Sequence, residues 1–261
     1  MNMDLSEAYD FAVVTARAAG ALLREYYERG VQTEYKGAID LITEADRASE
    51  KLIWDRIRTA YPDCAILSEE SGSNRQASRY LWIADPLDGT TNFAHGYPIF
   101  AVTIALQIDD VIELGVTYDP LRNELFTAWR GQGARLNNRP IHVSSTPVLD
   151  RSLLTTGFPY DRRTNPHNNL RQHNAFMLKS HGVLRGGSAA IDLACVACGR
   201  NDGYWEFRLN AWDVAAGILM VNEAGGRVTN PAGEVVHGWS GDVVASNGLI
   251  HNEMLGVLRS L

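Results

Sequence analysis

Apolar residues in the first quarter of the chain recur at helical spacing. Between residues 4 and 29 they form one stripe. It comprises Leu5, Ala8, Ala12, Ala16, Ala19, Leu22, Leu23 and Tyr26. A stripe with a period near 3.6 residues predicts an amphipathic helix whose apolar face lies in the core. We expect a second helix from about Glu44, because Thr43 and Asp46 have the spacing of a capping box and apolar residues follow on one face.

The pattern changes near residue 80, where β-branched and aromatic residues become frequent. Strands are predicted at 80–84, 99–108, 111–118 and 124–129, and Asp109-Asp110 is typical of a hairpin turn. After residue 150 strands and helices alternate. The predicted strands are 152–156, 183–185, 203–206, 227–229 and 243–246, and the predicted helices are 168–180, 189–199, 211–224 and a last one at the C-terminus. This mixture predicts a mixed α/β (α+β) fold of layered sheets and helices rather than a purely parallel sheet.

Length and charge limit the choice of function. With 261 residues, 45% of them apolar, the chain can build one large domain or two closely packed lobes around a real core. The net charge of -7 argues against the broad electropositive surface that nucleic-acid binding requires. The acidic N-terminus, and Arg17 within the apolar stretch 11–23, argue against a signal peptide or a membrane span. We therefore expect a cytoplasmic protein.

The three cysteines do not predict a disulfide framework, because their number is odd in a long chain. Cys195 and Cys198 form a CxxC motif, which raises a redox or zinc interpretation. They lie within an apolar run that predicts a helix, and no second Cys/His pair follows at zinc spacing. Two cysteines packed along a helix are the favoured interpretation, since a free cysteine behaves as a small buried apolar residue. Their role stays open.

The stretch WIADPLDGTTNF places two acids at the end of an apolar run. Asp85 and Asp88 would repel each other, and one would take up a proton unless a divalent cation neutralised them. Mg²⁺ prefers oxygen ligands, and the turn offers the Leu87 carbonyl beside the two carboxylates. Gly89 and Thr90 then begin a short predicted helix, whose free N–H groups suit a phosphate. A turn with a helix-capping aspartate is the alternative for this segment alone.

Two further acids follow similar patterns. Glu69 follows the apolar run 65–67 after one serine, Ser68, and Asp213 falls in the first turn of a long apolar helix. Each has an ordinary explanation, a solvated loop for Glu69 and a favourable partner for the helix dipole for Asp213. Three such ordinary explanations in one chain are less convincing together than one acidic site.

The joint motifs resemble the inositol monophosphatase family of Mg²⁺-dependent, lithium-sensitive phosphatases. They are Glu69-Glu70-Ser71, DPLDGTTNF at 85–93, GSAAIDLACVACGRNDGYWE at 187–206 and LNAWDVAAGILMVNEAGG at 209–226. The motifs occur in the same order as in that family, and the resemblance extends from Lys36 to Gly226. It implies a layered αβαβα sandwich of the inositol monophosphatase and fructose-1,6-bisphosphatase type. This would be one domain over 1–261, with an N-terminal lobe of about 1–145 and a C-terminal lobe of about 146–261.

The resemblance also implies roles for individual residues. Two or three Mg²⁺ ions are expected per site, the first held by Glu69, Asp85 and the Leu87 carbonyl and the second by Asp85, Asp88 and Asp213. The remaining roles concern water, phosphate and substrate. Glu69 and Thr90 would orient the attacking water, Asp46 would pair with Thr90 and help a third metal, Gly89 and Thr90 would bind phosphate, and Ala189, Glu206 and Asp213 would contact the substrate.

The implied reaction is hydrolysis of a phosphate monoester, with myo-inositol 1-phosphate as the expected substrate. Catalysis would come from positioning a metal-activated water and neutralising phosphoryl charge, without a phosphoenzyme. Nucleotide-directed relatives tend to carry Lys at the position of Thr91, which favours the inositol branch. Phe158 stands where animal enzymes carry a polyol-contacting serine, which weakens that assignment. Fructose 1,6-bisphosphate and histidinol phosphate remain alternatives.

Other classes of protein fit the residues less well. A haloacid-dehalogenase-type phosphatase needs a DxD motif, but Pro86 and Leu87 separate the two acids here, and an aspartic protease needs Asp-Thr-Gly rather than Asp-Gly-Thr. Bacterial family members associate with transcription machinery, which implies a partner-binding regulatory role as an alternative without support from the acidic composition. The family is commonly dimeric, so a homodimer is expected. The predicted strand 99–108 could serve that interface or the core equally well.

Overall fold

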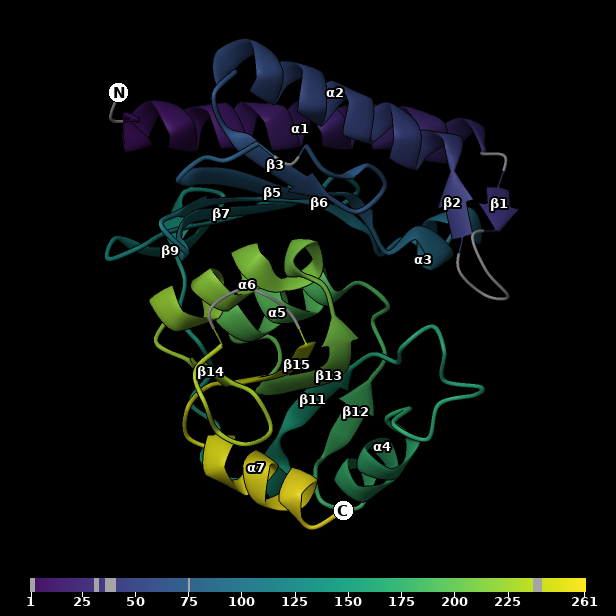
Figure 1. Ribbon diagram of the computed structural model, residues 1–261. Coiled ribbons are helices and arrows are strands. Elements are labelled where there is room, and N and C mark those ends of the chain that lie inside the picture. The colour runs from purple at the N-terminus through teal and green to yellow at the C-terminus, as the bar shows by residue number, and fades with distance from the viewer. Residues whose placement is uncertain (1–2, 31–32, 36–40, 75, 237–240) are drawn as a thin grey trace.

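The computed structural model describes residues 3–30, 33–35, 41–74, 76–236 and 241–261 (Figure 1). Lys36, where the resemblance begins, lies outside these residues. The described chain forms five layers, in the order helices, sheet, helices, sheet, helices. The predicted layered αβαβα class is therefore confirmed.

The first helical layer pairs α1 (Leu5–Arg29) with α2 (Glu44–Ala60). Helix α1 begins where the side chain of Asp4 accepts hydrogen bonds from the N–H groups of Ser6 and Glu7, at 2.8 and 3.3 Å. The buried face of α1 is mostly alanine, and small side chains let the helix lie close to α2 and to the sheet. The apolar stripe seen in the sequence therefore faces the core, as predicted.

The large sheet has eight strands in the order β10-β9-β8-β7-β6-β5-β3-β4. They are β3 (Ala65–Ser68), β4 (Gly72–Ser73), β5 (Tyr80–Asp88), β6 (Ala101–Ile108), β7 (Val111–Asp119), β8 (Glu124–Trp129), β9 (Gly133–Leu136) and β10 (Arg139–Pro140). Two further strands, β1 (Thr33–Tyr35) and β2 (Leu41–Thr43), form a small separate ladder next to the short helix α3 (Thr90–Ala94). The meander predicted between 99 and 129 is confirmed.

Strand β5 is longer than predicted, and its extension carries acids. It continues past Ala84 to Asp88, with an irregularity in its pairing with β6 between Asp85 and Asp88. Irregular pairing of this kind re-aims side chains at a sheet end. Strand β3 runs parallel to β5, with Ser68 opposite Ala84. Because parallel strands end at the same edge, Glu69 emerges beside the acidic end of β5.

The middle layer consists of α5 (Ala189–Ala197) and α6 (Ala211–Glu223), which are covered by a sheet on each side. Both helices are buried on almost every face, as expected for helices whose residues are apolar all round. Gly115 of β7 allows the backbone of α6 to lie close to the large sheet, because a Cβ atom at this position would lie 2.9 Å from the Cα of Ala216. The backbone of α6 thus rests directly on the large sheet.

The second sheet has five strands in the order β12-β11-β13-β15-β14. They are β11 (Leu153–Thr156), β12 (Gly182–Leu184), β13 (Gly203–Leu209), β14 (Arg227–Thr229) and β15 (Gly241–Ser246). Helices α4 (Leu170–Met177) and α7 (His251–Arg259) cover its outer face (Figure 1). The 3-10 turn η1 (Leu149–Arg151) precedes the first strand of this sheet.

Several predicted boundaries differ from the structure. The strand predicted at 203–206 continues to Leu209, and the helix predicted at 168–180 is limited to α4. Strand β13 continues past a bulge at which Arg208 adopts a left-handed φ of 62°. Six short strands, β1, β2, β3, β4, β9 and β10, were not predicted, because runs of two to four residues give little periodicity.

The strand predicted at 99–108 serves the core. It is β6, paired on both sides by β5 and β7, and its residues from Ala101 to Leu106 are buried. It is therefore unavailable as a subunit interface. The large sheet uses residues before 141 and the second sheet residues after 152, whereas the division into lobes near residue 145 stays a prediction. None of the described helices is both long and apolar enough to cross a membrane.

A buried histidine joins α7 to the second sheet. The ring of His251 is fully buried, and its two nitrogens are hydrogen-bonded at 2.9 Å to the hydroxyls of Thr229 and Ser246. Burial lowers the pKa of His251 to about 4, and the nearby charge of Arg227 acts in the same direction. The neutral imidazole is therefore the form that the folded protein accommodates.

We predict that His251 makes the protein less stable as pH falls. Its ordinary pKa of 6.5 applies in the unfolded chain, so the unfolded state binds more protons between pH 6.5 and about 4. This favours unfolding by roughly 3 kcal/mol at pH 4. The loss should be smaller in His251→Gln, measured as the free energy of unfolding in urea at several pH values. Replacement of the exposed His181 by Gln is the matched control and should leave the pH slope unchanged.

Candidate active site

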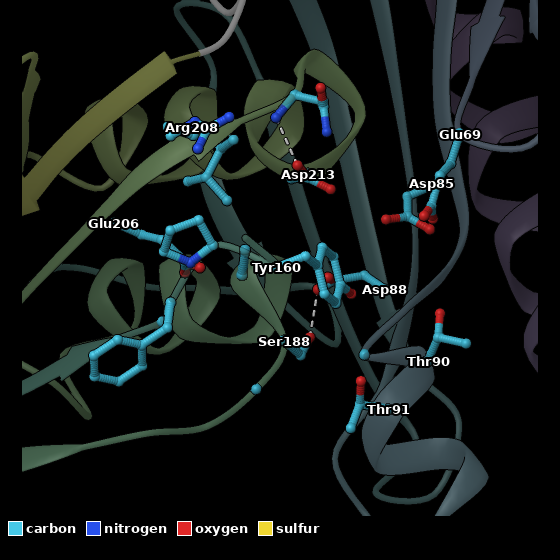
Figure 2. Close-up of a pocket in the computed structure, with 18 of the residues that line it drawn as sticks. Glu69, Asp85, Asp88, Thr90, Thr91, Tyr160, Ser188, Glu206, Arg208 and Asp213 are labelled. Carbon is cyan, nitrogen blue, oxygen red and sulfur yellow. Dashed lines mark hydrogen bonds between the residues drawn. The ribbon is translucent and has the colours of Figure 1, made fainter. Parts of the chain in front are cut away.

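One pocket lies between the edge of the large sheet and the N-terminal ends of α5 and α6 (Figure 2). Most of the residues predicted for the site line it. They are Glu69, Asp85, Leu87, Asp88, Gly89, Thr90, Ala189, Glu206 and Asp213. The exception is Asp46, which reaches the site through Thr90. The structure therefore brings together residues that are up to 144 positions apart between Glu69 and Asp213.

Three carboxylates converge in this pocket. Oxygen atoms of Asp85, Asp88 and Asp213 lie within 4.8 Å of one another. Asp85 and Asp88 come from the end of β5, and Asp213 comes from the first turn of α6. Glu69 is not part of this closest trio, but Figure 2 shows its side chain beside Asp85. Four acids thus face one small volume, a donor set suited to hard divalent cations.

Burial and mutual repulsion make this cluster unfavourable without a cation. The pKa of Asp85 is raised well above its ordinary value, first by burial and then by the charges of Glu69, Asp88 and Asp213. The pKa of Asp213 is raised by burial and by the charge of Asp88. Burial also raises the pKa of Asp88, although hydrogen bonds to its carboxylate partly offset the effect. A bound cation would reverse these shifts.

Asp88 is held in place by the N-terminus of α5. Its Oδ2 accepts hydrogen bonds from the Ser188 hydroxyl at 2.5 Å and from the Ala190 N–H at 2.8 Å. Ser188 is also the N-cap of α5, where its hydroxyl accepts from the N–H of Ile191. The sequence analysis did not select Ser188. Its position directly before an apolar helical run was the available signal, because serine is a preferred N-cap.

Asp213 has two functions in the structure. Its Oδ2 accepts a hydrogen bond from the Asn210 N–H at 2.6 Å, which is the capping-box interaction at the start of α6. The same carboxylate faces Asp85 and Asp88. Asp213 therefore lies at the start of a helix, as its ordinary explanation requires, and its carboxylate also lines the acidic pocket.

Thr90 is positioned by a carboxylate and a carbonyl. Its hydroxyl lies 3.0 Å from Asp46 Oδ1 and 3.0 Å from the Leu87 carbonyl oxygen, and both can accept its hydrogen bond. Asp46 is fully buried, and its Oδ2 accepts from the N–H and the hydroxyl of Thr43 at 2.8 and 2.5 Å. The predicted capping box and the predicted pairing with Thr90 therefore coexist in one side chain.

Gly89 provides a turn that other residues would not fit. Its φ is 96°, and a Cβ atom at this position would lie 3.0 Å from the Ile99 carbonyl oxygen. The turn lets α3 begin directly after the acids of β5. Gly89, Thr90 and Thr91 thus line the pocket opposite the Asp213 end of α6 (Figure 2).

The far side of the pocket is formed by the second sheet. Burial raises the pKa of Glu206 to about 7, although a hydrogen bond from the Tyr204 hydroxyl at 2.7 Å opposes this shift. Gly157 leaves room for the Glu206 carboxylate, since a Cβ there would lie 2.1 Å from its oxygens. Ala189 and Phe158 line the same wall. This side places the Glu206 carboxylate beside the apolar side chains of Ala189 and Phe158.

Cys195 and Cys198 lie apart from the acidic cluster. Both are free, half-buried cysteines at the end of α5, and burial raises the pKa of Cys195 to about 12. Among the described residues, the cluster with metal-ligand geometry contains only the three aspartates. The interpretation of packed helix cysteines therefore agrees with the structure.

The layered αβαβα fold places a cluster of carboxylates at the edge of its large sheet. A protein of this class can bind divalent cations there, and cations can in turn bind a phosphate ester. The chain belongs to the inositol monophosphatase family, whose family model matches residues 4–260. That family is Mg²⁺-dependent, and membership supports phosphatase activity.

Individual relatives agree with this membership. The inositol-1-monophosphatase of Synechocystis sp. is 48% identical over 259 residues, which cover 98% of this chain and 90% of that protein. The Nus factor SuhB of Escherichia coli is 43% identical over 253 residues, covering 96% and 95%. The solved inositol monophosphatase from Anabaena sp. is 45% identical and superposes with a TM-score of 0.90, covering 99% of this chain and 98% of that one.

We predict that Asp85→Asn stabilises the metal-free protein. Asn keeps an oxygen that can accept from the Leu87 N–H, now at 2.9 Å, but removes a repelled charge. Because the pKa of Asp85 is raised in the folded state, its cost grows as pH rises above the ordinary value of 3.8. In EDTA the stability gain of the variant should therefore increase from pH 4 towards neutrality, measured by urea unfolding. Added Mg²⁺ should stabilise the unsubstituted protein more than the variant.

Proposed function

We propose that the chain is a Mg²⁺-dependent phosphate monoester hydrolase whose substrate is myo-inositol 1-phosphate or a closely similar polyol phosphate. The observation that carries this proposal is the convergence of Asp85, Asp88 and Asp213 within 4.8 Å. A cluster of buried acids with raised pKa values is unfavourable for folding alone. It becomes useful when cations and an anionic substrate occupy the pocket.

The residues present fit the expected metals. Carboxylate and carbonyl oxygens are the ligands that Mg²⁺ prefers. Glu69, Asp85 and the Leu87 carbonyl would hold one ion, and Asp85, Asp88 and Asp213 a second. When bound, such ions lower the pKa of a water molecule and neutralise charge on the phosphoryl and leaving oxygens.

The protein's own groups would orient the attacking water and bind the phosphate. Asp46 takes the proton of the Thr90 hydroxyl into a hydrogen bond, so the lone pairs of Thr90 Oγ1 are left to orient a water together with Glu69. The N–H groups of Gly89 and Thr90 would donate to phosphate oxygens. Because a metal-activated water would attack the phosphate, no phosphoenzyme is needed and Asp85 would serve as a metal ligand, with its carboxylate held by the Leu87 N–H.

The inositol assignment rests on the wall beside Glu206. A carboxylate there can accept hydrogen bonds from vicinal hydroxyls, while Ala189 leaves space for a ring and Asp213 lies at the boundary with the acids. Phe158 makes the wall more apolar than a serine would. Fructose 1,6-bisphosphate and histidinol phosphate are the alternatives on the same scaffold.

The test is phosphate release from these three substrates, with and without Mg²⁺ and with added Li⁺. The proposal predicts Mg²⁺-dependent, Li⁺-inhibited release that is fastest with the inositol phosphate. Release without any divalent cation, or no release from the whole panel, would contradict it. A preference for another of the substrates would reassign the pocket but keep the reaction class.

A second function is favoured by the relatives named Nus factor SuhB, which are 43–44% identical to this chain. That name suggests a partner in transcription for those proteins. We predict that Asp88→Asn lowers kcat by at least about a hundredfold, because it removes a carboxylate ligand of the second proposed Mg²⁺ ion. Pull-down of transcription proteins from a cell lysate should be the same for this variant and for the unsubstituted protein. The exposed Asp10→Asn on α1 is the matched control for both measurements.

Glu206 should give the polyol reaction its own pH dependence. Its protonated fraction falls as pH rises towards about 7, and bound Mg²⁺ would move that transition lower. We expect kcat/KM for inositol phosphate to rise between pH 4.5 and 7 more steeply than for an aryl phosphate without hydroxyls. In Glu206→Gln the two profiles should become parallel. Profiles that already run parallel in the unsubstituted protein would exclude Glu206 from substrate recognition.

A homodimer and a cytoplasmic location complete the proposal, both taken from the family resemblance. The buried strand β6 is not its interface. Exposed apolar side chains lie elsewhere, at Leu178 after α4 and Leu184 on the edge strand β12, which are 88% and 48% exposed.

A further inference from the structure

Helix α2 carries a row of buried polar side chains towards the active site. Asp46, Ser49 and Glu50 are spaced i, i+3 and i+4, so they share one face of the helix. Their exposed fractions are 0%, 0% and 7%. Burying such groups is costly unless each is hydrogen-bonded, so their partners indicate why they are there.

Glu50 binds the loop that carries Glu69. Its Oε1 accepts hydrogen bonds from the N–H groups of Glu70 and Ser71, at 3.2 and 3.0 Å, and from the hydroxyl of Ser68. Its Oε2 accepts from the Ser71 hydroxyl at 2.6 Å. The donors come from the residues on both sides of Glu69. The carboxylate therefore fixes the backbone from which the Glu69 side chain projects.

The neighbouring contacts tie the same helix to the other parts of the site. The Ser49 hydroxyl donates to the Pro86 carbonyl at 2.8 Å, between Asp85 and Leu87. Asp46 accepts from Thr90, as described above. One turn beyond Glu50, the Trp54 indole N–H donates to the Ser68 hydroxyl at 2.8 Å. One helix face thus bonds to three separate segments that line the pocket.

We propose that Glu50 is a positioning residue that places Glu69 for cation binding. This inference rests on the proposed function, because it assumes that Glu69 contributes to a metal site. Glu69 lies in a short connection between β3 and the two-residue strand β4. The carboxylates of Glu69 and Asp85 lie side by side (Figure 2), and like charges this close repel each other. The four donors held by Glu50 keep the loop in place against this repulsion.

The inference is tested by direct binding of Mn²⁺, a probe for Mg²⁺ sites, to the full chain by calorimetry. Residues that orient metal ligands typically affect affinity by about 10- to 100-fold. We expect Glu50→Ala to weaken Mn²⁺ binding within that range. Glu50→Gln should have a smaller effect, because its amide oxygen still accepts from the two backbone N–H groups. Glu44→Ala, at the exposed start of the same helix, is the matched control and should bind like the unsubstituted protein.

Kinetics separate positioning from a merely structural role. In Glu50→Ala the Mg²⁺ concentration for half-maximal phosphate release should rise by a similar factor, while kcat at saturating Mg²⁺ and KM for substrate stay near their original values. A folded Glu50→Ala with unchanged Mn²⁺ affinity overturns the inference. So does a variant that only melts at lower temperature and binds normally.

Further measurements distinguish failure of the role of Glu50 from failure of the proposed function. If Glu50 variants do not fold, Ser71→Ala removes the hydroxyl donor to Oε2 from an exposed residue, and a several-fold weakening of Mn²⁺ binding is expected; unchanged binding overturns the inference. If the unsubstituted protein neither binds Mn²⁺ nor releases phosphate, the proposed function itself fails. Normal binding by the unsubstituted protein and by Glu50→Ala alike contradicts only the role of Glu50.

Discussion

Repulsion among buried carboxylates is the constraint around which this molecule is organised. Asp85, Asp88 and Asp213 share a volume less than 5 Å across, and burial and their own charges raise their pKa values. The protein answers with neutral donors, such as the Ser188 hydroxyl and the N–H groups of Leu87 and Asn210. These donors and the nearby charge of Arg185 lower the cost, but the three carboxylates would still be stabilised further by a bound cation. Affinity for cations therefore follows from an arrangement that is unfavourable without them.

The five-layer fold explains how distant acids reach one place. Parallel β3 and β5 end at one edge of the large sheet, which brings Glu69 next to Asp85. Helices α5 and α6 lie beneath that sheet with their N-terminal ends towards the same edge (Figure 1). Helix N-termini carry partial positive charge, which favours Asp88 and Asp213 there. The close contact of α6 with Gly115 makes the distance between the two groups of acids a property of the core rather than of a loop.

Many elements of the fold and several residues of the pocket were predictable from local sequence patterns. The capping box at Thr43 and Asp46, the acids at the end of β5 and the meander all have short-range signatures, and the structure confirms them. What the sequence could not reveal depends on long-range contacts. Ser188 bonds to an acid 100 positions away, and Glu50 to a loop about 20 positions away, with nothing local that distinguishes them from an ordinary N-cap and an ordinary helix glutamate. The bulge at Arg208 was missed for a similar reason, since left-handed φ is rare for arginine.

The polar face of α2 shows how such a site can persist before a cation binds. Without bracing, the repelled segments would relax apart, and each binding event would have to draw them together again. The bonds from Asp46, Ser49 and Glu50 join three of these segments to a single rigid helix without adding positive charge to the pocket. This bracing by uncharged hydrogen-bond partners leaves the pocket able to gain further stabilisation from a bound cation, beyond the charge that Arg185 supplies near Asp88. The stability lost in holding the acids together is then recovered when cations bind, so the same repulsion that opposes folding makes the pocket favour positive charge.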